Sequence, residues 1–258
     1  MRFASLGSGS RGNATIVTAG STTILVDCGF SVRETAARLA RAGVDPEEID
    51  AILVTHEHED HVGGVGALAR RYGAKVWSTA GTRRSAAGAL GEVPRICVFS
   101  SHDSFAIGDL LIEPIAVPHD ASEPTQFVFS DGQSRVGLLT DAGCITPHIR
   151  RMLSGLSALL LEFNHDEEML RRGPYPAVLK QRISSDLGHL SNAQSAALLR
   201  EIDTHRLQHL VALHLSQQNN DAGLVRAAAA AALNCSADWI GVADQDGGYG
   251  WREICAGV

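Results

Sequence analysis

The chain has 258 residues, and its 22 basic and 29 acidic side chains give a formal net charge of −7. Hydrophobic residues make up 45% and charged residues 20%, which is ordinary for a folded domain and excludes disordered, collagen-like and low-complexity proteins. No apolar run approaches the roughly 20 residues of a membrane span, and the N-terminus lacks a signal-peptide-like segment. The five cysteines show no CxxC spacing, which favours reduced thiols. We therefore expect a cytoplasmic protein with a single domain over residues 1–258 and no membrane partner.

Short apolar runs, rich in β-branched residues, alternate with helical patterns along the chain. The apolar runs predict strands at 2–6, 14–19, 22–27, 51–55, 74–78, 95–99, 110–117, 126–130, 135–140, 157–162, 208–214 and 239–242. The helical patterns predict helices from 31 to about 42, from about 63, over 146–154, from 191 to about 203, and over 221–233. Some neighbouring strands are separated by helices and others by turns. The pattern therefore predicts a mixed sheet, or two sheets, with helices on the outside.

Histidine is the unusual residue, because three of the 11 histidines fall within the segment HEHEDH at residues 56–61. This segment follows an apolar strand, and in an extended chain His56 and His58 point to the same side. These two imidazoles can bind one metal ion while Asp60 and His61 turn toward a second. A lone HxH would favour a solvated polar loop. Three histidines and an aspartate directly after a buried strand instead favour metal binding, with ligands that suit Zn²⁺, Mn²⁺ or Fe²⁺.

Three further polar residues end apolar strands elsewhere in the chain. His119 follows the run EPIAVP, Asp141 follows VGLLT, and His214 follows LVAL. Any one of them alone would be read as a helix cap or a surface residue. Because functional residues are commonly placed at the ends of rigid strands, the repeated pattern predicts that all three are additional metal ligands.

These motifs, in this order, resemble the metallo-β-lactamase superfamily. The resemblance implies an α/β (α+β) fold, the αββα sandwich, in which helices flank two mixed sheets and two metal ions lie at one edge. It implies that Asp141 bridges the two ions, where typical β-lactamases have a cysteine, which argues against lactam hydrolysis and for the phosphodiesterase, nuclease or glyoxalase branches. The other ligands that it implies are His56, His58 and His119 for the first ion, and Asp60, His61 and His214 for the second.

A histidine outside the ligand set indicates the chemistry. The segment Gly188-His189-Leu190-Ser191 is similar to a segment of tRNase Z and the cyclic phosphodiesterases in which a non-ligand histidine faces the scissile phosphate. The sequence Leu160-Leu161-Glu162 is similar to the strand end whose glutamate orients that histidine. In isolation, His189 would be a surface residue at a helix start. In this context we expect His189 to be a general acid or phosphate ligand, with Glu162 as its partner.

The most specific resemblance is to the bacterial YycJ-like, or WalJ-like, subfamily, which is associated with 5′-to-3′ exonuclease activity on DNA and a role in DNA repair. The chain departs from the expected pattern at Gln126, where a small residue is expected. The segments that carry the resemblance are 6–13, 55–61, 118–121, 162–166, 188–192, 213–216 and 219–220.

Two roles are possible for some of the other polar residues. The glycine- and serine-rich loop 7–13 could form a nest of backbone N–H groups for an anion, so Ser8, Ser10 and Asn13 are candidate substrate-binding residues, although a tight turn is the alternative. Asn164, with its neighbour His165, could face the site or form a surface turn. The remaining histidines (102, 148, 205 and 209) lack the strand-end context and are expected to be structural or exposed.

The sequence hypothesis is thus a phosphodiesterase or nuclease with two divalent ions, Zn²⁺ or Mn²⁺. Hydroxide generated at the ions would attack phosphorus, with Asp60 orienting the water and His189 protonating the leaving oxygen. The substrate would be a nucleic acid, DNA in preference to RNA. The alternatives are another hydrolase on the same scaffold, such as a cyclic phosphodiesterase or a glyoxalase-type thioesterase, and a non-catalytic metal-binding module. The sequence leaves the metal and the oligomeric state open.

Overall fold

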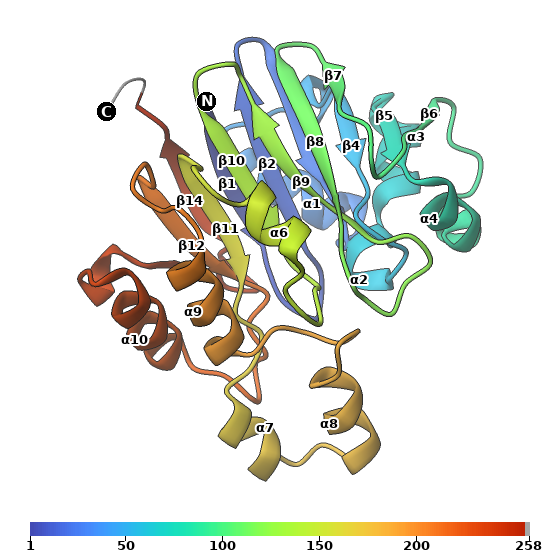
Figure 1. The fold of residues 1–258 in the computed structure, drawn as a ribbon. Helices are drawn as coiled ribbons and strands as arrows, with labels where there is room; N and C mark the ends of the chain where they lie inside the picture. Colours follow the sequence, from blue (N-terminus) through green and yellow to red (C-terminus); the bar gives the residue numbers. More distant parts are fainter. Residues whose placement is uncertain (256–258) are drawn as a thin grey trace.

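The computed structural model describes residues 1–255, which form two sheets packed face to face (Figure 1). The first sheet has the order β14-β1-β2-β3-β4-β5-β6, and β3 to β6 run parallel. Its strands are β1 (Arg2–Gly7), β2 (Ala14–Ala19), β3 (Thr22–Val26), β4 (Ala51–Leu53), β5 (Lys75–Ser78), β6 (Ile96–Val98) and β14 (Tyr249–Glu253).

The second sheet mirrors this arrangement, with the order β13-β12-β11-β10-β9-β8-β7. Strands β10 to β13 run parallel, whereas β7, β8 and β9 are joined as an antiparallel meander. Its strands are β7 (Phe105–Ile107), β8 (Leu110–Ala116), β9 (Thr125–Ser130), β10 (Arg135–Leu139), β11 (Ala158–Glu162), β12 (His209–Leu213) and β13 (Gly241–Val242). The prediction of two mixed sheets is therefore confirmed.

Helices cover the outer faces of both sheets (Figure 1). The first sheet is covered mainly by α1 and α3, and the second by α6, α9 and α10. The helices are α1 (Val32–Arg41), α2 (Glu59–Val62), α3 (Val65–Tyr72), α4 (Ala80–Ser85), α5 (Ala87–Leu90), α6 (Pro147–Met152), α7 (Glu167–Arg172), α8 (Ala177–Ile183), α9 (Asn192–Glu201) and α10 (Ala222–Leu233). None of the helices in residues 1–255 combines the length and the apolar character that crossing a membrane requires.

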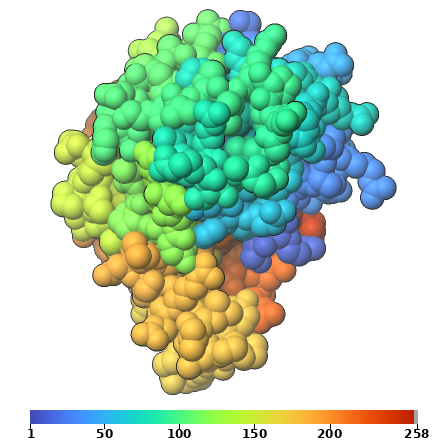
Figure 2. All heavy atoms as spheres, turned by 90° about the vertical axis from the view of Figure 1, so that its right-hand side faces the viewer, coloured from blue at the N-terminus to red at the C-terminus, as the bar shows by residue number. Residues whose placement is uncertain are grey.

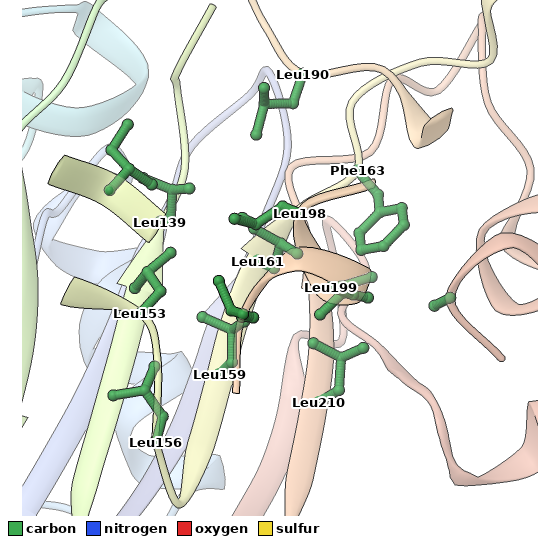
Figure 3. Packing of buried hydrophobic residues seen from close by; sticks show 14 of the residues in the cluster. Leu139, Leu153, Leu156, Leu159, Leu161, Phe163, Leu190, Leu198, Leu199 and Leu210 are labelled. Carbon is green, nitrogen blue, oxygen red and sulfur yellow. The ribbon is translucent and has the colours of Figure 1, made fainter. Parts of the chain in front are cut away.

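Three apolar layers hold the sandwich together: one lies between the two sheets, and one lies between each sheet and the helices that cover it. Between the sheets, aromatic and aliphatic side chains such as Phe3, Phe127 and Leu160 are fully or almost fully buried. Leu159 and Leu161, which alternate with Leu160 along β11, instead face the helices and lie beside Leu198 and Leu199 (Figure 3). A strand that is buried on both faces has apolar residues at successive positions. The run Ala-Leu-Leu-Leu in β11 has this pattern and was therefore predicted as a strand.

Several elements were not predicted. Strand β14 pairs with β1 at the edge of the first sheet, and its sequence YGWRE has a weak apolar pattern because its side chains are only partly buried or exposed. Helices α7 and α8 were missed because each is short and α8 has no side-chain cap at its N-terminus. Helices α4 and α5 and strand β7 are also short and were not predicted.

One end of the sandwich gathers the loops that carry the chemically interesting residues. Strands β1, β3 and β4 of the first sheet point toward this end, as do β8, β10, β11 and β12 of the second. Because the carboxyl ends of these strands meet at one edge, residues far apart in sequence converge there. The sequence folds in this way because each of these loops follows an apolar strand whose position the core fixes.

Candidate metal centre and active site

Three of the residues that converge at this edge have an unusual backbone conformation. Asp27, Asp141 and His214 have φ values of 59°, 52° and 57°. Asp27 and His214 directly follow a strand, and a single residue separates Asp141 from the end of its strand. All three are almost completely buried. The left-handed region is sparsely populated by residues other than glycine and costs conformational energy, so its occurrence in a cluster indicates a functional constraint.

His56, His58 and His119 form the first cluster of potential ligands. The Nδ1 atom of His58 lies 3.0 Å from Nε2 of His56 and 3.3 Å from Nε2 of His119. His119 Nδ1 donates a hydrogen bond of 3.0 Å to the carbonyl oxygen of Gly188, which leaves its Nε2 lone pair free. Burial, reinforced by neighbouring imidazoles, lowers the pKa of both His56 and His119, which favours the neutral, metal-binding form.

Asp60, His61 and His214 form the second cluster. Oδ2 of Asp60 lies 3.6 Å from Nε2 of His61 and 3.6 Å from Nε2 of His214. The Nε2 atom of His214 is buried and has no hydrogen-bond partner among residues 1–255. An orphaned buried nitrogen at the meeting point of a carboxylate and a second imidazole fits a bound metal ion.

Asp141 lies between the two clusters. Its Oδ2 is 3.2 Å from His61 Nε2, and its Oδ1 is 4.0 Å from His119 Nε2 and 3.6 Å from His214 Nδ1. Burial alone would raise the pKa of this carboxyl, but His214 and His61 hold it well below its usual range. Asp141 in turn raises the pKa of His61 well above its usual value and that of His214 to about 10, against the effect of their burial.

The donor set fits divalent metal binding. The structure contains four overlapping groups of three or four His, Asp or Glu residues whose ligand atoms lie within 4.8 Å of one another. These groups contain imidazole and carboxylate donors, which suit Zn²⁺ and Mn²⁺. All seven residues predicted as ligands belong to at least one of the four groups.

His189 and Glu162 form a pair beside the clusters. Nδ1 of His189 lies 2.8 Å from Oε1 of the buried Glu162, whose other oxygen accepts hydrogen bonds from the backbone N–H groups of Ala142 and Leu190. Despite the cost of burial, the His189 imidazole lowers the pKa of Glu162 to about 2, and Glu162 raises the pKa of His189. Because Nδ1 contacts Glu162, the other ring nitrogen of His189, Nε2, faces away from Glu162.

Part of the site lines a cavity with a volume of about 400 Å³. Its lining includes His58, Asp60, Asp141, His189 and His214 on the side of the two sheets. Ser10 and Asn164, two of the predicted substrate-binding residues, also line this cavity. Asn164 additionally donates a hydrogen bond of 3.1 Å to the His214 carbonyl oxygen.

Ser8 and Asn13 lie outside the cavity lining and are occupied by internal hydrogen bonds. The Ser8 hydroxyl accepts the backbone N–H of His214 at 2.8 Å and lies 3.3 Å from Oδ1 of Asn13. Asn13 Nδ2 donates to the Gly9 carbonyl oxygen and lies 3.1 Å from His61 Nε2. Both residues thus contact the second cluster, Ser8 through His214 and Asn13 through His61, and we propose that they position these ligands. Their contact with substrate stays a prediction.

Asp27 is a site residue that the sequence analysis missed. Its two carboxylate oxygens accept hydrogen bonds from the Thr55 backbone N–H (2.8 Å) and hydroxyl group (2.7 Å), and Oδ2 also lies 2.8 Å from His61 Nδ1. This contact orients the ring so that Nε2 faces the second cluster. The signal was present, because Asp27 ends an apolar strand in the same way as Asp141 does.

Gln126 contacts the backbone next to the site, and the remaining histidines lie outside the cavity lining and the ligand groups. Gln126 is fully buried, and its Oε1 accepts the backbone N–H of Thr140, next to Asp141. This contact gives a reason for the large residue where a small one was expected. Within the described chain, neither His165 nor the four histidines at 102, 148, 205 and 209 line the cavity or belong to a ligand group.

Comparison with known proteins identifies the family of this chain. Residues 22–214 match the beta-lactamase superfamily domain. The chain belongs to the metallo-β-lactamase superfamily. It is 36% identical over 228 residues to exodeoxyribonuclease YycJ of Bacillus anthracis, covering 88% of this chain and 86% of the relative. It is 37% identical over 223 residues to exodeoxyribonuclease WalJ of Streptococcus pneumoniae, covering 85% and 83%.

The fold of the superfamily is evident in solved structures as well. The metallo-β-lactamase-fold protein YhfI of Bacillus subtilis superimposes with a TM-score of 0.75 over 97% of this chain and 98% of its own, at 16% identity. The resemblance inferred from the motifs is thus confirmed, and so is the fold that it implied. The protein is accordingly a hydrolase of this superfamily with a candidate site for divalent metal.

The contact between Asp27 and His61 can be tested by the substitution Asp27→Asn, because asparagine tolerates the left-handed backbone while removing the carboxylate. We expect metal affinity at the second cluster to fall by roughly 10–100-fold, as for other residues that orient a ligand. Titration of the metal-free protein against a chelating indicator measures this. The matched control is Asp109→Asn, whose carboxylate also accepts a backbone N–H but lies outside the cavity. Unchanged affinity in Asp27→Asn would show that Asp27 does not support the ligand.

Proposed function

We propose that this protein is a phosphodiesterase with two divalent metal ions that removes nucleotides from the 5′ end of DNA. The observation that carries the proposal is the Glu162–His189 pair beside the two ligand clusters, in which Oε1 of Glu162 lies 2.8 Å from Nδ1 of His189. A lone metal site would be compatible with many hydrolytic reactions. His189 lines the cavity and lies outside the clusters His56–His58–His119 and Asp60–His61–His214, although it groups with Asp141, Glu162 and His214. In this position it would supply the proton donor that expulsion of an alkoxide from phosphorus needs.

The roles of the ligands follow from the two clusters. His56, His58 and His119 would hold the first ion, and the second would be held by Asp60, His61 and His214, with Asp141 shared between them. When bound, Zn²⁺ or Mn²⁺ ions supply a nucleophile at neutral pH and offset the negative charge that develops on the phosphate. Asp60, which lies at the cavity wall, would also orient the attacking water.

His189 would protonate the leaving oxygen. Because Nδ1 is engaged by Glu162, the proton available to substrate is on Nε2, and the ring lines the cavity. Glu162 is fixed by the Ala142 and Leu190 backbone N–H groups, so it orients the ring without swinging toward a substrate. Ser10, at the same cavity, would donate a hydrogen bond to a phosphate or sugar. Asn164 also lines the cavity, but its Nδ2 already donates to the His214 carbonyl oxygen, so its contact with substrate would use the rest of its amide group.

Two features support a nucleic acid substrate and DNA in particular. The relatives that match most of this chain are named exodeoxyribonucleases. Aspartate at the position between the clusters is compatible with phosphodiester chemistry, as the sequence analysis expected. A role in DNA repair, and a single domain spanning the whole chain, remain part of the proposal.

End-labelled oligonucleotides test the proposed activity directly. We expect the Mn²⁺- or Zn²⁺-loaded protein to release labelled mononucleotide at once from 5′-labelled DNA, and to shorten 3′-labelled DNA progressively. The products are resolved on a denaturing gel, with parallel RNA substrates and a chelator control. Internal cleavage without mononucleotide release would contradict an exonuclease. Faster cleavage of RNA would contradict the preference for DNA, and cleavage of no substrate would overturn the proposed function.

The separate roles of ligand and general acid can be distinguished by two substitutions. His56→Ala should lose metal and activity together, because it removes a ligand from the first cluster. His189→Ala should keep its metal but lose about 10²–10⁴-fold in kcat, the usual contribution of a positioned proton donor. Elemental analysis and DNA cleavage measure the two effects, with the exposed His205→Ala as the control. Wild-type turnover by His189→Ala would rule out its catalytic role.

A further inference from the structure

The cavity has a second wall that the proposed chemistry does not use. Tyr175, Leu179, Arg182 and Ile183 line it opposite the residues contributed by the strand ends. They belong to α8 and to the loop between α7 and α8, a segment inserted between β11 and α9. Figure 2 shows this segment, in gold, projecting from one end of the molecule. It therefore reaches beyond the sandwich and encloses the cavity from the side.

The two walls differ in chemistry. The wall at the strand ends carries imidazoles and carboxylates, whereas the α8 wall presents a phenol ring and two branched aliphatic side chains, all partly exposed. Arg182 is the one Lys or Arg side chain that lines the cavity within residues 1–255. With divalent ions bound at the strand-end wall, a ligand that fits both walls would combine an anionic group with a flat or apolar group. A nucleotide has this combination, with its phosphate at one end and its base at the other.

A polar contact joins the two walls. Nε of Arg182 donates a hydrogen bond of 2.6 Å to Oδ2 of Asp120. The other oxygen of Asp120 lies 3.5 Å from His119 Nε2 and 3.8 Å from His58 Nε2. Asp120 thus joins α8 to the first histidine cluster, so the α8 wall and the strand-end wall face one cavity.

We propose that Tyr175, with Leu179 and Ile183, binds the base of the nucleotide being removed, after that base has left the helical stack. This inference rests on the proposed function and specifies how the terminal nucleotide is held. A cavity of about 400 Å³ is the size of a small-ligand pocket. A base must leave the helical stack to lie against its wall, and aromatic side chains bind such unstacked bases irrespective of sequence. Arg182 contacts the phosphate on the same nucleotide.

The experiment compares Tyr175→Ala and Tyr175→Phe with the wild type on two single-stranded DNA oligonucleotides with 5′ phosphates. One has a normal terminal nucleotide, and the other has an abasic terminal residue. Loss of a stacking partner should raise KM by roughly 5–100-fold, with a smaller effect on kcat. Tyr175→Phe keeps the ring and should stay close to wild type. Val178→Ala is the matched control, since Val178 is on α8 but is 80% exposed and outside the cavity lining.

The abasic oligonucleotide separates base binding from a structural effect. For the wild type, removal of the base should raise KM by about the same factor as the Tyr175→Ala substitution does on the normal substrate. The Tyr175→Ala variant should have the same KM for both substrates. Equal KM for wild type and Tyr175→Ala, or the same abasic penalty in both, would overturn the inference.

The failure of this inference can be distinguished from failure of the proposed function. If no oligonucleotide is cleaved, the proposed function fails, and the same two oligonucleotides are then compared by fluorescence anisotropy for binding alone. A preference of the wild type for the normal terminus, lost in Tyr175→Ala, would still support the base-binding wall. Equal affinities in that assay would overturn it. Metal content is measured in each variant, and it should remain at the wild-type value.

Discussion

The arrangement of this site depends on burying the carboxylate of Asp141 among imidazole rings. Asp141 is almost fully buried, and nitrogens of His61, His119, His189 and His214 lie 3.2–4.0 Å from its oxygens. A buried carboxylate without compensation costs several kcal/mol, so Asp141 can stay ionised only if positive or polarisable groups surround it. The imidazoles that the strand ends place around Asp141 compensate this charge, so the carboxylate and the rings stabilise one another.

This electrostatic arrangement requires both sheets. Asp60 and His61 follow β4 in the first sheet, whereas Asp141 and His214 follow β10 and β12 in the second. The second cluster is therefore complete only when the sheets pack face to face, and the apolar layer around Phe127 and Leu160 holds them in that position. Ser8 adds a direct contact, because its hydroxyl accepts the His214 backbone N–H from the loop after β1. The second cluster is thus formed only in the fully packed structure.

Much of this could be predicted from sequence, because strand ends are local signals. Buried strands read as apolar runs, so His119, Asp141 and His214 stood out as polar residues at positions that topology then brings together. Asp27 has the same signal but was missed, because no family motif drew attention to it. The hydrogen bonds of Ser8 and Asn13 to the interior depend on contacts between distant segments, which sequence spacing does not show. The second cavity wall was not foreseen, because α8 is short and lacks a capping side chain.

The central claim is that two metal ions share Asp141 at the junction of the sheets. The most direct test is the number of metal ions per chain, measured by elemental mass spectrometry on protein loaded with Zn²⁺ and then freed of excess metal. The account predicts about two ions per chain, as for other sites in which two ions share a carboxylate. A value of one ion per chain at saturation, or binding that survives the loss of both histidine clusters, would contradict it.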